Sequence, residues 1–109
     1  MKVYSAYQGG RLTVYLQGEL DQHEARQTME AVDRLLDEYL PRECVLDFGG
    51  LSFMDSSGIA LILKLHRRIS GGGGRAWIEH ASAQPLRVLD ASGVERIMNL
   101  PLVREGNSR

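Results

Sequence analysis

The sequence predicts a single α/β domain with a mixed β-sheet, in which an N-terminal hairpin is followed by mostly parallel strands with packed helices. Three observations support this fold class. The first residues alternate polar and apolar side chains with period two. The remainder alternates strand-like and helix-like segments. Finally, 109 residues with 43% apolar side chains fit one hydrophobic core, so one domain is expected over residues 1–109, with a frayed tail from about residue 101.

The first two strands are predicted to form a β-hairpin. Residues 2–7 and 12–16 each alternate with period two, and Gln8-Gly9-Gly10 between them is a turn signal. We expect one face of this hairpin to remain in solvent and one strand to form an antiparallel edge. Residues 18–23 are then predicted to form a loop.

An amphipathic helix is predicted next. Apolar residues recur at three- and four-residue spacing from Ala25 to Leu40, with charged residues between them. Asp21 is the expected N-cap, and Glu24 completes a capping box with it. Pro41 ends the helix, because the residue before a proline disfavours the helical conformation.

The centre of the chain combines a short strand with an unusually apolar segment. Residues 44–48 are β-prone, and Gly49-Gly50 is expected to interrupt the strand. Leu51 and Phe53 are expected to fold back onto the core. The apolar segment that follows is too long for a strand and predicts a helix from about Ser56 to Ile69.

This helix begins on Asp55-Ser56-Ser57-Gly58. Small hydroxyl and carboxylate side chains are favoured at a helix start, because they accept hydrogen bonds from the first unpaired N–H groups. The same position holds serine hydroxyls at the tip of a rigid element, beside the positive end of the helix dipole.

The C-terminal third is predicted to contain a strand, a helix and a last short strand. Gly71 to Gly74 follow a helix and precede the strand around Trp77, which is the wrong order for a phosphate-binding loop. Ser82 is expected to cap a helix that ends at Gly93, and residues 94–98 are expected to form the last strand.

Composition excludes several function classes. The net charge of −1, from 13 basic and 14 acidic residues, predicts neither nucleic-acid binding nor attraction to a membrane surface. There is no apolar run of the ~20 residues that a bilayer span needs, and no signal peptide, so a cytoplasmic protein is expected. Cys44 is the only cysteine and is expected to be a small buried residue. No metal site and no cofactor are predicted.

Two segments together resemble a known family. Leu51-Ser52-Phe53-Met54-Asp55-Ser56-Ser57-Gly58, followed by an apolar run, resembles the phosphorylation segment of the bacterial anti-sigma factor antagonists of the STAS-domain family. Gly18-Glu19-Leu20-Asp21 is similar to a second family segment. The resemblance extends to about Met98 and is closest to the sporulation branch, the anti-sigma F factor antagonists.

The resemblance implies a function and a set of site residues. The unphosphorylated domain would bind an anti-sigma factor that is also a serine kinase holding ATP or ADP, and would thereby release a sigma factor. Phosphorylation of Ser56 would inactivate the domain, and a serine phosphatase would restore it. The implied contact residues are Asp21, His23, Asp55, Ser56, Ser57 and Gly58. Family members usually carry one more C-terminal helix, which is not expected in this chain.

Other function classes fit the residues less well. A hydrolase would need a base beside Ser56, and among the histidines only His23 lies on a loop that could approach it. An aspartyl-phosphate receiver using Asp47 or Asp55 would need further carboxylates for Mg²⁺, and the first strand offers none. The chain is therefore not predicted to be an enzyme. The remaining alternative is a STAS scaffold or stress-signalling module whose serine is never phosphorylated.

Overall fold

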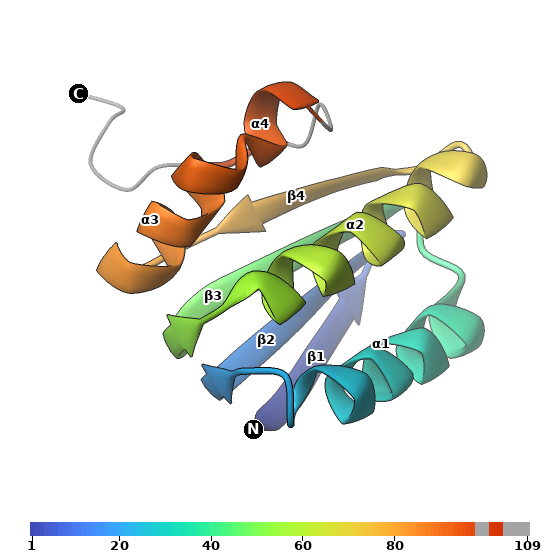
Figure 1. Cartoon of the computed structure of the whole chain (residues 1–109). Helices are drawn as coiled ribbons and strands as arrows, with labels where there is room; N and C mark the ends of the chain where they lie inside the picture. Colours follow the sequence, from blue (N-terminus) through green and yellow to red (C-terminus); the bar gives the residue numbers. More distant parts are fainter. Residues whose placement is uncertain (98–100, 104–109) are drawn as a thin grey trace.

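The computed structural model shown in Figure 1 describes residues 1–97 and 101–103. Within them the chain forms four strands and four helices, which are β1 (Lys2–Gln8), β2 (Arg11–Leu20), α1 (Ala25–Tyr39), β3 (Glu43–Met54), α2 (Ser56–Gly71), β4 (Arg75–Glu79), α3 (Ala83–Ser92) and α4 (Val94–Ile97). The strand order in the sheet is β1-β2-β3-β4. β1 is antiparallel to β2, and the other neighbours are parallel, which confirms the predicted fold class.

The predicted hairpin is confirmed. Its two-residue turn consists of Gly9 and Gly10, with φ angles of 60° and 83°. Positive φ at both central residues matches the right-handed twist of the strands, and glycine adopts it without a steric penalty. Along β2, Val14 and Leu16 are buried whereas Tyr15 is 40% exposed, so one face of the hairpin is in solvent.

The strand β3 differs from its predicted form. Gly49 and Gly50 do not interrupt it, because the strand continues to Met54 and stays paired with β2 through two register shifts. These bulges change the phase of the side chains, so that Leu51 and Met54 point into the core without strict alternation. Phe53, which was expected in the core, is 38% exposed.

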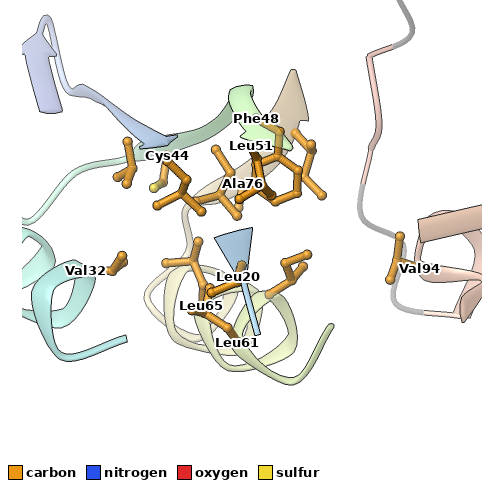
Figure 2. Packing of buried hydrophobic residues seen from close by; sticks show 14 of the residues in the cluster. Leu20, Val32, Cys44, Phe48, Leu51, Leu61, Leu65, Ala76 and Val94 are labelled. Atoms are coloured by element: carbon orange, nitrogen blue, oxygen red, sulfur yellow. The ribbon is translucent and has the colours of Figure 1, made fainter. Parts of the chain in front are cut away.

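The core lies between the sheet and the helices. In Figure 1, α1 and α2 run side by side along the sheet, and α3 lies beyond α2, where it contacts β3. Figure 2 shows Leu61 and Leu65 of α2 facing the strand residues Cys44 and Leu51. Cys44 is fully buried in the core, as predicted, and this burial raises the pKa of its thiol to about 12.

The predicted helices are largely confirmed, with two differences at their ends. Leu40 was expected to pack inward, but it is 76% exposed and has a φ of 46° at the C-cap of α1, directly before Pro41. Residues 94–97 form the short helix α4 instead of the predicted strand. Its first residue, Val94, is buried, so this segment still contributes to the core.

The remaining C-terminal predictions lie partly outside the described residues. Met98, the last residue of the expected strand, and residues 104–109 of the expected tail are not described. Leu102 is described, is buried, and forms a parallel bridge with Ile78 at the edge of β4. None of the helices among the described residues is long and apolar enough to cross a lipid bilayer.

Candidate functional site

The two segments that carry the family resemblance meet at one end of the sheet. Leu20 at the end of β2 is paired with Met54 at the end of β3. The next residue, Asp55, donates its backbone N–H to the carbonyl of Leu20, with an N–O distance of 3.2 Å. Since carboxyl ends of parallel neighbours lie at the same edge, the loop after Leu20 and the start of α2 form one adjoining surface.

Asp55 is the N-cap of α2, as predicted. Its backbone is extended, and its Oδ1 atom accepts a hydrogen bond from the backbone N–H of Ser57 at 2.8 Å. Its carbonyl accepts a second one from the N–H of Gly58 at 3.0 Å. These bonds leave Ser56 exposed at the first helical position, while Ser57 is half-buried. Ser56 is therefore the more accessible of the two hydroxyls.

Gly58 is buried beneath this turn. A Cβ atom at this position would lie 2.3 Å from Cγ of Met54 and 3.2 Å from a methyl carbon of Leu20. The absent side chain lets the first turn of α2 pack directly on the ends of β2 and β3. The structure thus gives Gly58 a packing role in positioning Ser56.

Asp21 stabilises the neighbouring turn, but not through the predicted capping box. β2 extends to Leu20, so the predicted loop is shorter and its first residues are in the strand. The Oδ1 atom of Asp21 accepts hydrogen bonds from the N–H groups of His23 and Glu24, at 2.9 and 3.0 Å. The carboxylate of Glu24 does not return to Asp21 and instead lies 3.5 Å from the amino group of Met1. The N-cap residue of α1 is Glu24, without a side-chain cap.

Two residues at the start of α3 contact the end of β3, and one of them, Gln84, has no counterpart among the predicted site residues. The side-chain amide of Gln84 accepts a hydrogen bond from the N–H of Met54 at 2.8 Å and donates one to its carbonyl at 3.0 Å. Ser82 is the N-cap residue of α3, as predicted, but its hydroxyl donates to the carbonyl of Leu51 at 2.9 Å and makes no side-chain cap. Together they hold the last residues of β3, directly before Asp55.

No local sequence signal marks Gln84, because its partner lies 30 positions earlier in the chain. Its amide satisfies both backbone groups of Met54 at the point where β4 no longer runs alongside β3. The position of the Asp55–Ser56 turn therefore depends on a contact that only the fold creates.

A groove of about 510 Å³ lies between α1 and α2 and reaches Ser57. Its walls combine apolar Met29 and Ala60 with the charged side chains of Arg26 and Lys64. Charged and apolar groups on an open surface of this kind suit a protein partner better than an enclosed small molecule. Among the described residues, one group of three side chains could hold a metal ion, namely Asp47, Glu79 and His80. This group does not include Ser56 or its neighbours.

The sequence of the chain also matches the model of a known protein family. The model of the STAS domain family matches residues 5–105, which is most of the chain. The chain therefore belongs to the STAS-domain family.

One relative indicates the branch of the family to which the chain is similar. The protein named anti-sigma F factor antagonist from Paenibacillus polymyxa is 32% identical over 98 residues, which cover 90% of this chain and 84% of the relative. Such antagonists are regulatory binding proteins and not enzymes. The resemblance predicted from the two sequence segments is thereby confirmed.

Solved structures show the same fold. The anti-sigma factor antagonist SpoIIAA in its unphosphorylated form has a TM-score of 0.77 and 24% identity, over 95% of this chain and 90% of that one. The Bacillus cell fate determinant SpoIIAA in the phosphorylated form has a TM-score of 0.69 and 24% identity, over 95% and 93% of the two chains.

Proposed function

We propose that this chain is an anti-sigma factor antagonist controlled by phosphorylation of Ser56. In the unphosphorylated state it binds an anti-sigma factor that is also a serine kinase holding ATP or ADP, and this binding releases a sigma factor. Phosphorylation of Ser56 by the kinase ends the interaction, and a serine phosphatase restores it. This cycle takes place in the cytoplasm, and the regulated programme is sporulation.

The observation that carries this proposal is the position of Ser56. It is exposed at the first position of α2, immediately after an N-cap whose hydrogen bonds use the Asp55 carboxylate and the Ser57 N–H. A kinase can reach this hydroxyl without opening the fold. The chain's relationship to anti-sigma F factor antagonists gives that exposed serine a regulatory context.

Electrostatics explain how one phosphate can act as a switch. A phosphoserine carries about −1.5 to −2 charges at pH 7. The amino end of α2 tolerates this charge, because the helix dipole and the first N–H groups favour an anion. The phosphate lies beside the carboxylate of Asp55, so phosphorylation adds negative charge to a surface that already carries a carboxylate. An acidic or tightly packed partner surface would then be repelled, since like-charge contact across an interface can cost several kcal/mol.

The partner surface extends beyond Ser56. Asp21 and His23 belong to the loop that follows β2, which adjoins Asp55 through the Leu20 carbonyl. On the other side, the groove between α1 and α2 begins at Ser57. We assign the contact surface to this loop, to the first turn of α2 and to the adjoining groove, with Gly58 setting its shape from below.

Phosphopeptide mapping tests the proposal. The full chain is incubated with ATP and the anti-sigma factor kinase of the same organism, and the digest is analysed by mass spectrometry. We expect one phosphate, on Ser56, and no phosphorylation of a Ser56→Ala variant. Ser57→Ala is the matched control, since it removes the adjacent hydroxyl and should still be phosphorylated.

Two outcomes would contradict the proposal. Phosphate on Ser57 alone would show that Ser56 is not the phosphorylated residue. Binding of the kinase without any phosphate transfer would identify the alternative, a STAS scaffold that is not switched by phosphorylation.

A further inference from the structure

A second group of polar side chains lies on the two C-terminal strands of the sheet. Asp47 of β3 and Glu79 of β4 are directly paired in the parallel register, and His80 follows Glu79. One ligand atom from each of the three side chains lies within 4.8 Å of the other two. Asp47 Oδ2 and His80 Nδ1 lie 2.8 Å apart.

The pairing of Asp47 with Glu79 places two carboxylates at directly opposite positions of neighbouring strands. Like charges at such positions destabilise a sheet. The imidazole of His80 can offset one of these charges when it is protonated. A divalent cation would offset both carboxylates.

Groups outside the cluster orient two of its three members. The N–H of Gly49 donates to Asp47 Oδ1 at 2.8 Å, and the indole N–H of Trp77 donates to Glu79 Oε2 at 2.7 Å. Metal-binding carboxylates are commonly held by such hydrogen bonds, which fix their orientation. The side chain of Asp47 is 14% exposed and that of His80 is 49% exposed, so the cluster is accessible to an ion from solvent.

The chemistry of the three side chains selects the class of ion. Two carboxylate oxygens and one imidazole nitrogen form a mixed set that Zn²⁺ accepts at about 2.0–2.2 Å, with water as the fourth ligand. Mg²⁺ favours oxygen ligands and retains several waters, so a nitrogen ligand does not suit it. Tetrahedral Zn²⁺ requires ligand atoms about 3.3 Å apart. The three ligand atoms already lie within 4.8 Å of one another, and none of the three side chains is fully buried, so changes of side-chain torsion can adjust their separations.

We propose that Asp47, Glu79 and His80 form a binding site for Zn²⁺ or a similar divalent transition metal, separate from the Ser56 surface. The sequence did not predict this site, because no second histidine or cysteine lies at a ligand spacing. The parallel register of β3 and β4 supplies the second carboxylate that the sequence did not place beside Asp47. The site does not depend on the function proposed for Ser56.

Calorimetric titration of the full, tag-free chain with ZnCl₂ tests this inference. We expect one equivalent of Zn²⁺ to bind, and Co²⁺ to give the visible absorption of a four-coordinate site. Glu79→Gln and His80→Ala should each weaken Zn²⁺ binding by about tenfold or more. His66→Ala is the matched control, because the ring of His66 lies beside Ser70 Oγ and outside the cluster, and Zn²⁺ binding should not change.

Circular dichroism of each variant establishes that it is folded, and Glu79→Gln preserves the size of the side chain. Equal Zn²⁺ affinity in the wild type, Glu79→Gln and His80→Ala would overturn the proposal, because the ion would then bind elsewhere. Absence of measurable Zn²⁺ binding by the folded wild type would overturn it as well.

Discussion

The two ends of the parallel sheet are closed in different ways. At the amino ends of β2, β3 and β4, backbone groups bind one another directly. The N–H of Arg42 donates to the carbonyl of Gly10, and the N–H of Arg75 donates to the carbonyl of Arg42, each at 2.9 Å. Gly9, Gly10 and Gly73 form the turns at this end with positive φ, and the absent side chain of Gly74 allows its close approach to the carbonyl of Arg42.

At the carboxyl ends of β2 and β3, side chains make most of the hydrogen bonds that hold the connecting segments. The carboxylates of Asp21 and Asp55 each accept backbone N–H groups, and the amide of Gln84 binds both backbone groups of Met54. Ser56, which directly follows Asp55, remains exposed on the surface. The comparison shows that direct backbone contacts close the amino end, whereas at the carboxyl end side chains hold the turn that exposes Ser56.

Substitution of Gly74 should give the largest effect. A Cβ atom there would lie 2.5 Å from the carbonyl oxygen of Arg42, which is backbone and cannot rotate away. We expect Gly74→Ala to lower the free energy of unfolding by about 1–3 kcal/mol in urea denaturation. Gly71→Ala is the matched control, since a Cβ there meets nothing within 4 Å, and it should not destabilise the chain. Equal stability of the two variants would show that the amino end is not closely packed.

Loss of the Gln84 side chain should have the next largest effect, at the opposite end. Gln84→Ala leaves two backbone groups of Met54 without their partners, which should cost about 1–2 kcal/mol. Hydrogen exchange should accelerate at Met54 and Asp55, but not at Arg75. Gln27→Ala, on the exposed face of α1, is the control and should change neither quantity. Unchanged exchange at Met54 in the Gln84 variant would remove Gln84 from the positioning of the site.

A smaller loss is expected for Gly58→Ala. The new methyl group would crowd Cγ and the sulfur of the fully buried Met54 side chain, which must shift. Inside a helix alanine is favoured over glycine by about 1 kcal/mol, which offsets part of this cost, so the net loss should be about 1 kcal/mol. If it destabilises the chain more than Gly74→Ala in the same urea experiment, the carboxyl end is the less adaptable of the two ends.

The smallest effect should come from Glu43, at the rim of the amino end. The hydrogen bond from Arg11, supported by Arg75, holds the pKa of the Glu43 carboxyl below its ordinary value of 4.5, although burial partly opposes this. Because the folded-state pKa is lowered, the contribution of Glu43 to stability is present above pH 4.5 and is lost as the pH falls through the folded-state pKa. The stability difference between wild type and Glu43→Gln should therefore shrink on acidification. A difference that grows below pH 4.5 would contradict this assignment.

Much of the fold could be predicted because its signals are local. Period-two alternation marked β1 and β2, and helical spacing with Asp55 and Pro41 at the boundaries marked α1 and α2. Only the first part of β3 was predicted, because its bulges break the period-two alternation and because Gly49-Gly50 is typical of a turn. α4 was mistaken for a strand, since four residues are too few to show a helical period.

The candidate site was predicted only in part, for the same reason. Asp55 and Ser56 carry a local helix-start signal, and the structure brings the Asp21 loop beside them. The contribution of Gln84 depends on a partner far away in sequence, and so does the pairing of Asp47 with Glu79. The first contact depends on how α3 packs against β3 and the second on strand register, and the sequence pattern alone specified neither.

Comparison of the free and Ser56-phosphorylated chains, by amide chemical shifts and by affinity for the anti-sigma factor, tests the central claim most directly. The account predicts shift changes confined to the neighbourhood of Asp21 and residues 55–61, together with a sharply reduced affinity. The reason is that the start of α2 tolerates the charge of the phosphate, which therefore alters the surface and not the fold. Ser56→Asp should behave similarly, and Ser56→Ala should still bind. Shift changes spread through residues 12–16 of β2 and 44–48 of β3 would contradict the account, and so would an affinity unchanged by phosphorylation.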